Sequence, residues 1–195
     1  MMKPLLAGAA CLALLAACNE RGASPAVDKA QDMAAAPVGQ VSAATLGSNT
    51  VDAYVPNAAM GDMYEVMAAD IALERSQNAE VKRLATMIKT DHADASSKLK
   101  GIIGGMNPPM QPPAALDQRR QGLIDNLRSA GAADFDNVWL DQQIAAHNEA
   151  LTLHRGFSDN TDATAAPLAA HARSVVPKIE AHLRQAEQLK AGPAA

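Results

Sequence analysis

Four ionisable side chains occupy positions of the helical pattern where an apolar residue is expected. His92, His147 and His182 interrupt three apolar stripes that repeat every three to four residues. Glu65 lies on the small-residue face of a fourth helical segment. Side chains at such positions point into a helical bundle, where imidazole and carboxylate groups can bind Zn, Fe, Mn, Cu or Ni. The pattern predicts a polar cluster in the core, with a single transition-metal ion as its candidate cofactor.

Three interpretations of this cluster remain open on the sequence alone. The first is a buried hydrogen-bonded network that only fixes the register of the helices, as in a structural or binding module. The second is a mononuclear metal site with a redox or stress-protective role, in which those four residues are the ligands and Asp91 and Asp141 orient the imidazoles. The third is acid–base catalysis without a metal.

A di-iron centre of the ferritin type is not expected, because that centre uses Glu-x-x-His motifs on two helices. In this sequence, a lysine or an isoleucine stands three residues before each histidine of the cluster. The sequence also has no G-x-S-x-G and no H-E-x-x-H motif, so it does not predict a serine hydrolase or a zincin. A binding or structural function is therefore favoured over an enzymatic one.

Other side chains that could bind a metal or take part in a reaction are expected to have ordinary structural roles. His154 lies near the end of its predicted helix, where partial exposure is expected, and His171 lies off the apolar stripe, on the predicted surface. Met60, Met63 and Met67 form a stripe at helical spacing, which is typical of a core face.

The first 17 residues are typical of a bacterial secretory signal, with one lysine followed by an apolar run. The run ends in Leu15-Ala16-Ala17-Cys18, which resembles the lipobox of lipoprotein precursors. This resemblance implies that residues 1–17 are removed and that Cys18 is lipidated, so that the membrane is a partner of the protein. Asn19 follows the lipidated position, which favours the periplasmic face of the outer membrane.

The rest of the chain divides into a tether and one helical domain. Residues 18–50 are rich in small and polar residues without a period, which predicts a disordered tether after the lipidated cysteine. The domain is expected over residues 51–190, with a tail at 191–195. Aromatic residues make up only 3% of the chain, which favours closely packed helices over a β-sandwich. A net charge of −4 without a basic cluster argues against a nucleic-acid partner.

The apolar period predicts an all-α fold, an antiparallel four-helix bundle with a short extra helix between its second and third helices. The expected helices span residues 52–76, 79–103, 115–130, 133–157 and 163–190. The proline-rich segment 107–113 cannot be helical and is expected to be a stiff connector.

Four short motifs along these helices resemble those of one bacterial family. The motifs are Gly61 to Val66, Val81 to Ala85 with Thr90-Asp91-His92, Phe135-Asp136 with Asp141 and His147, and Val176-Pro177 with His182-Leu183. In this order they resemble the DUF4142 family of exported proteins, and the resemblance covers about Thr50 to Leu189. It implies a ferritin-like bundle and a location in the cell envelope. It implies no activity, because the family has none assigned.

Overall fold

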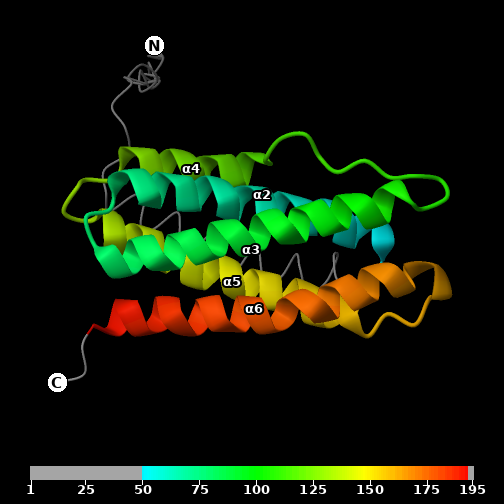
Figure 1. The fold of residues 1–195 in the computed structure, drawn as a ribbon. Helices are drawn as coiled ribbons and strands as arrows, with labels where there is room; N and C mark the ends of the chain where they lie inside the picture. The colour runs from blue at the N-terminus through cyan, green and yellow to red at the C-terminus, as the bar shows by residue number, and fades with distance from the viewer. Residues whose placement is uncertain (1–49, 193–195) are drawn as a thin grey trace, which may run out of the picture.

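The computed structural model describes residues 50–192, which form helices and connecting segments and contain no strand (Figure 1). The helices are α2 (Val51–Arg75), α3 (Ala79–Gly104), α4 (Gln118–Ser129), α5 (Phe135–Ser158) and α6 (Ala166–Ala191), with a 3-10 turn at Ala163–Ala165. The expected signal peptide, the lipidation site Cys18 and nearly all of the tether lie outside the described residues. No helix within residues 50–192 combines the length and the apolar character that a membrane span needs.

The four long helices form an antiparallel bundle, as predicted. α2 packs against α3 and α5, and α6 packs against the other sides of α3 and α5. Each pair of neighbours runs in opposite directions (Figure 1). The proline-rich connector and α4 carry the chain back along the bundle between α3 and α5, and α4 covers α2. One long crossover of this kind is the connectivity of ferritin-like bundles.

Local signals explain where two of the helices begin. The side chain of Asn78 accepts a hydrogen bond from the backbone N–H of Glu80, which caps α3 at the predicted position. The α4 helix begins later than expected, at Gln118, because Asp117 caps it by accepting from the N–H of Arg120 at 2.7 Å. The capping residues Asn78 and Asp117 therefore determine where α3 and α4 begin, and the apolar pattern alone does not.

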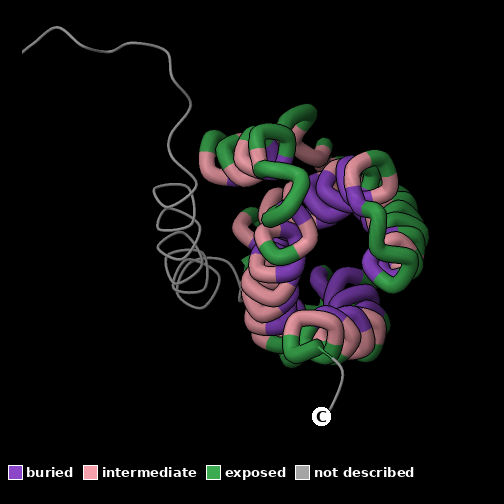
Figure 2. Tube along the Cα trace, turned by 90° about the vertical axis from the view of Figure 1, so that its left-hand side faces the viewer, coloured by how far each residue is buried: buried purple, intermediate pink, exposed green. Residues whose placement is uncertain are grey.

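A layer of buried polar side chains, which includes His92, His147 and His182, divides the bundle core. One apolar cluster contains Leu84 and Ile88 of α3, and another contains Leu99 and Ile103 at the far end of the same helix. His92 lies between them on α3 and is itself buried. The bundle seen from its end has its buried positions turned inward (Figure 2). The polar layer therefore has apolar packing above and below it.

The methionine stripe of α2 belongs to this core only in part, since Met67 packs against one of the apolar clusters. Met60, Met63 and Met67 are half-buried, whereas Asp62 and Glu65 are buried. The reason is that α3, α4 and α5 all pack on α2. Together they cover its small-residue face, and this packing places the two carboxyl groups inside the bundle.

Candidate metal centre

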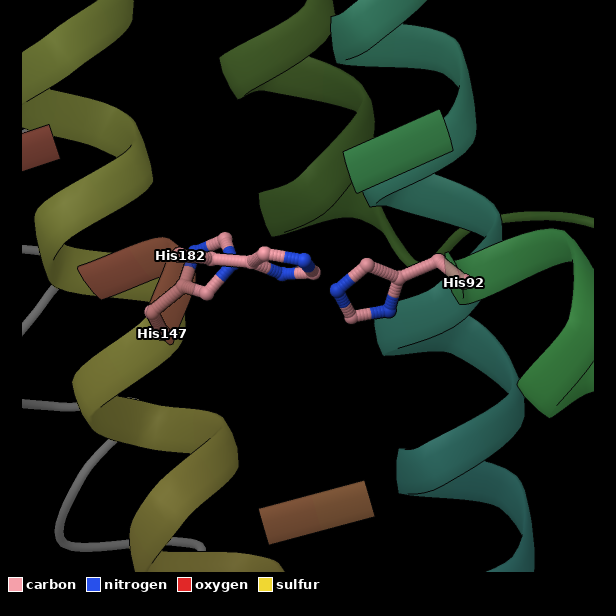
Figure 3. A group of neighbouring side chains, drawn as sticks. All are labelled: His92, His147 and His182. Atoms are coloured by element: carbon pink, nitrogen blue, oxygen red, sulfur yellow. The ribbon is translucent and has the colours of Figure 1, made fainter. Parts of the chain in front are cut away.

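Three of the predicted residues converge in the polar layer. His92 of α3, His147 of α5 and His182 of α6 each offer one ring nitrogen, and these nitrogens all lie within 4.8 Å of one another. Figure 3 shows the ring of His92 reaching toward the other two rings. The three side chains are 6%, 1% and 1% exposed. The three imidazoles therefore form one compact buried cluster, which we call the histidine centre.

Hydrogen bonds fix the proton positions of His147 and His182. Nδ1 of His147 lies 2.8 Å from the backbone carbonyl oxygen of Gln143, which can only accept, so this nitrogen carries the proton. Nε2 of His182 donates in the same way to the Asp91 carboxylate at 3.0 Å. When both rings are neutral, the remaining nitrogens are unprotonated. These are Nε2 of His147 and Nδ1 of His182, which face one another at 3.2 Å.

His92 is held by a residue that the sequence analysis missed. Nδ1 of His92 lies 2.8 Å from the Asp62 carboxylate, and both side chains are buried. Nε2 of His92 is buried without a hydrogen-bond partner. In its neutral form, this ring donates through Nδ1 and leaves the lone pair of Nε2 free.

All three rings therefore follow one rule. Each donates one N–H to an oxygen atom and, when the ring is neutral, keeps one unprotonated nitrogen. Histidines that bind metals are held in this way, since the oxygen partner fixes both the tautomer and the direction of the ring. Two nitrogens bound to one tetrahedral ion at 2.0–2.1 Å lie about 3.3 Å apart. The 3.2 Å between His147 and His182 matches that separation.

Electrostatics keeps two of the rings neutral. Burial holds the pKa of His147 well below its usual range, and the charges of His92 and His182 lower it further. Burial and the charge of His92 lower the pKa of His182 to about 4. Burial also disfavours a charge on His92, but the hydrogen bond and the charge of Asp62 outweigh it, so the pKa of His92 is raised. Near pH 7, His147 and His182 therefore have lone pairs available for a cation.

Asp91 lies beside the histidine centre, where its carboxylate accepts a hydrogen bond from Nε2 of His182 at 3.0 Å. Besides His182, its carboxylate contacts Nζ of Lys178 at 2.6 Å. Burial raises the pKa of Asp91, but the hydrogen bonds from Lys178 and His182 more than compensate, and the pKa is lowered. Asp91 is therefore a carboxylate at neutral pH and acts as an acceptor.

Glu65 lies beside the histidine centre but is not one of its converging donors. Its Oε1 is 3.6 Å from Nδ1 of His147, the nitrogen that already donates to Gln143. Its Oε2 is buried without a partner. Burial, opposed by the charge of His92, raises the pKa of Glu65 to about 7. The structure therefore places the predicted fourth ligand next to the cluster, on the far side of His147.

Asp141 is not part of the centre, contrary to the prediction. It is 41% exposed, and its carboxylate pairs with Nζ of Lys190 at 2.9 Å. Asp141 precedes His147 by six positions on α5, and this spacing turns the two side chains to different faces of the helix. Asp62 takes the role expected of Asp141. Its position three residues before Glu65, on the same face of α2, is the sequence signal that would have identified it.

His154 of α5 and His171 of α6 form a second group of buried polar side chains. His154 and His171 were expected at or near the surface, but each is only 5% exposed. The cause is packing between helices: the ring of His154 lies against Tyr54 of α2 and faces His171 of α6. The Tyr54 hydroxyl lies 3.0 Å from Nδ1 of His154, and burial lowers the pKa of His154 to about 3. Nε2 of His171 is buried without a partner.

Comparison with known proteins gives a family but no relative of known activity. The model of a family described as a domain of unknown function, DUF4142, matches residues 35–189. No curated protein and no solved structure matches the chain. Since the family match covers more than half of the 195 residues, the chain belongs to the DUF4142 family.

Proposed function

We propose that this protein binds one divalent transition-metal ion at the histidine centre, between α3, α5 and α6. One observation carries the proposal: three buried imidazoles converge within 4.8 Å, and each holds an oxygen acceptor on its other nitrogen. Without a cation, the lone pairs of His147 and His182 repel one another at 3.2 Å. A metal ion turns this repulsion into two bonds.

The donor set points to zinc or copper. Imidazole nitrogen suits Zn, Cu, Fe and Ni, and affinities among divalent ions peak at copper. The carboxylates that orient the rings, Asp62 and Asp91, place negative charge beside the site, and Lys178 offsets that of Asp91. The ion would draw the three helices together within the polar layer and stabilise the fold by its binding free energy.

The competing function is that of a structural or binding module, in which a proton takes the place of the metal. A single proton shared between His147 and His182 would also remove the repulsion between their lone pairs. The polar layer would then only fix the register of the helices. The two interpretations differ in one property, the response of the protein to added metal.

The location proposed for this activity is the cell envelope. The lipobox-like sequence that ends at Cys18 supports export and lipid anchoring. The small and polar composition of residues 18–50 predicts a tether, and a flexible chain of about 30 residues has an r.m.s. reach of roughly 30 Å, which would hold the bundle clear of the lipid surface. We propose the periplasmic face of the outer membrane as the site of attachment.

Metal analysis of the purified mature protein tests the proposal. After incubation with zinc or copper and dialysis, we expect about one ion per chain and a rise in melting temperature. His147→Ala should abolish both effects. His154→Ala is the matched control, since His154 is also a buried histidine of α5 but contacts Tyr54. Equal metal retention by the two variants, or none by the wild-type protein, would contradict the proposal.

A further inference from the structure

The histidine centre comes nearest to solvent at Asp91, between α3 and α6. Each ring of the centre donates to one oxygen acceptor, and the three acceptors belong to Asp62, Asp91 and Gln143. The side chain of Asp62 is 6% exposed and Gln143 is fully buried, whereas the side chain of Asp91 is 26% exposed. Asp91 is therefore the acceptor at which the centre is most open to solvent.

One ring connects this exposed carboxylate with the inside of the centre. Nε2 of His182 contacts Asp91 at 3.0 Å, and Nδ1 of the same ring faces His147 at 3.2 Å. The His182 ring thus reaches from the carboxylate to the position proposed for the ion. Movement of this one side chain therefore suffices to open a path between Asp91 and the centre.

An ammonium group occupies the outer side of Asp91. Nζ of Lys178 lies 2.6 Å from Oδ1 of Asp91 and 3.6 Å from Oδ2 of Asp94. A position between two carboxylates suits a cation, and here the ammonium group fills it. The Lys178 side chain is 42% exposed, and ion pairs of such exposure contribute little free energy. Another cation can therefore displace Lys178 from Asp91.

The backbone of α6 has one hydrogen bond fewer at the same point. Pro177 directly precedes Lys178 inside α6 and has no N–H group. The carbonyl of Arg173 therefore lacks its usual helical donor. A helix bends more easily where such a bond is missing, so the α6 segment that carries Lys178 can move at lower cost than a regular helix.

The opposite side of the bundle is closed by α4. Figure 1 shows α4 and α6 on opposite sides of the bundle. Arg119 donates two hydrogen bonds of 2.8 Å to Glu149 of α5, and Arg120 donates one of 2.9 Å. Both arginines line one small cavity together with Asp62, so these ion pairs hold α4 over the Asp62 side of the centre. The side between α3 and α6 has no such cover.

We propose that the metal ion enters the histidine centre between α3 and α6, where it displaces the ammonium group of Lys178 from Asp91. This inference rests on the proposed function and adds the route of the ion and a residue that controls it. Lys178 slows entry in two ways: it occupies the carboxylate that an incoming ion needs, and its charge repels that ion. Asp94, an exposed carboxylate beside Asp91, attracts the ion to the same point.

The test measures the rate of zinc uptake. Metal-free mature protein is mixed with zinc in a stopped-flow instrument, and an indicator reports the free ion. Lys178→Met removes the ammonium group and keeps an unbranched side chain, so we expect uptake at least about threefold faster than in the wild type. Lys178→Gln should behave like Lys178→Met and serves if that variant fails to fold. Lys178→Arg keeps the charge beside Asp91 and should be no faster than the wild type.

Two control variants separate this route from other effects. Lys98→Met removes the same charge from an exposed lysine of α3 whose partner is Asp94 and not Asp91. Its rate of uptake should stay close to that of the wild type. Glu149→Gln weakens the ion pairs that hold α4 on α5 and should leave the rate unchanged, because the ion does not pass under α4.

The outcomes distinguish this inference from the proposed function. Uptake that is equally fast in Lys178→Met and the wild type, or equally accelerated in Lys178→Met and Lys98→Met, overturns the inference and leaves the metal site standing. Faster uptake in Glu149→Gln alone means that the ion enters under α4, which also overturns it. If the wild type binds no zinc, both the inference and the proposed function are wrong.

Discussion

Nε2 of His147 and Nδ1 of His182 face one another at 3.2 Å in the centre of the bundle. Their other ring nitrogens donate to the Gln143 carbonyl and the Asp91 carboxylate. Neutral rings therefore present two lone pairs to each other, away from solvent. This arrangement is costly on its own and becomes favourable when a cation lies between the rings. The lone pairs of His147 and His182 thus face a position that suits a cation.

Removing the acceptor of His92 should weaken metal binding without removing a ligand. Asp62→Asn keeps the shape of the side chain but removes the charge that holds Nδ1 of His92 protonated. Losses of this kind typically cost 10–100-fold in metal affinity. We expect such a loss for zinc in competition titrations with a chromophoric chelator. Asp141→Asn is the control and should leave the affinity unchanged, since Asp141 pairs with Lys190. Equal affinities of the two variants would show that Asp62 does not orient His92.

The metal-free protein should lose stability as the pH falls below the usual histidine pKa of about 6.5. Four histidines have lowered pKa values because they are buried, so below pH 6.5 protons bind to them mainly in the unfolded chain. They are His147, His154, His171 and His182. Glu65, with its pKa raised to about 7, acts in the opposite direction between about pH 7 and 4.5. The pKa of His92 is raised, so its contribution is already complete below pH 6.5.

Each proton bound only by the unfolded chain lowers the free energy of unfolding by about 1.4 kcal/mol per pH unit. The four histidines outweigh Glu65, so we expect a fall of at least about 2 kcal/mol between pH 6.5 and 5, measured by urea unfolding. His154→Gln removes one of these groups and should flatten the dependence. A free energy of unfolding that stays constant over this range would mean that the histidines are accessible to protons in the folded state.

The hydrogen bond between Tyr54 and His154 should contribute to stability and not to metal binding. Tyr54→Phe leaves Nδ1 of His154 without a donor inside the bundle, at a cost of about 1–3 kcal/mol. The phenylalanine ring can keep the stacking of Tyr54 on Phe157, whose ring centroids are 3.9 Å apart. The double variant Tyr54→Phe/His154→Leu removes both partners and should be more stable than the sum of the single effects predicts. Strict additivity would contradict this account.

The apolar period predicted the helices and the inward positions of the three histidines, because these depend on side chains one turn apart on the same helix. The neighbours of the histidines depend on packing between helices instead. Asp141 was expected beside the cluster and pairs with Lys190, while Asp62 lies inside because α4 covers α2. The buried positions of His154 and His171 have the same origin. The spacing of residues within one helix does not show along what length that helix packs against its neighbours.

Anchoring of the protein is a separate prediction. If Cys18 is lipidated, metabolic labelling with a fatty acid should label the wild-type protein. Cys18→Ser should abolish the label and either release the protein into the soluble periplasmic fraction or block its processing. Cys11→Ser is the control, because Cys11 lies within the segment expected to be removed. A wild-type protein that is soluble, unlabelled and cleaved elsewhere would rule out the lipoprotein assignment.

X-ray absorption spectroscopy of the zinc-loaded mature protein tests the central claim most directly. We expect one zinc ion per chain with three imidazole nitrogens at about 2.0–2.1 Å and one further light ligand. In His182→Ala, the imidazole scattering should fall or the zinc should be lost. A first shell of oxygen atoms without imidazole scattering, or a wild-type protein that retains no zinc after dialysis, would contradict the assignment of the histidine centre as a metal site.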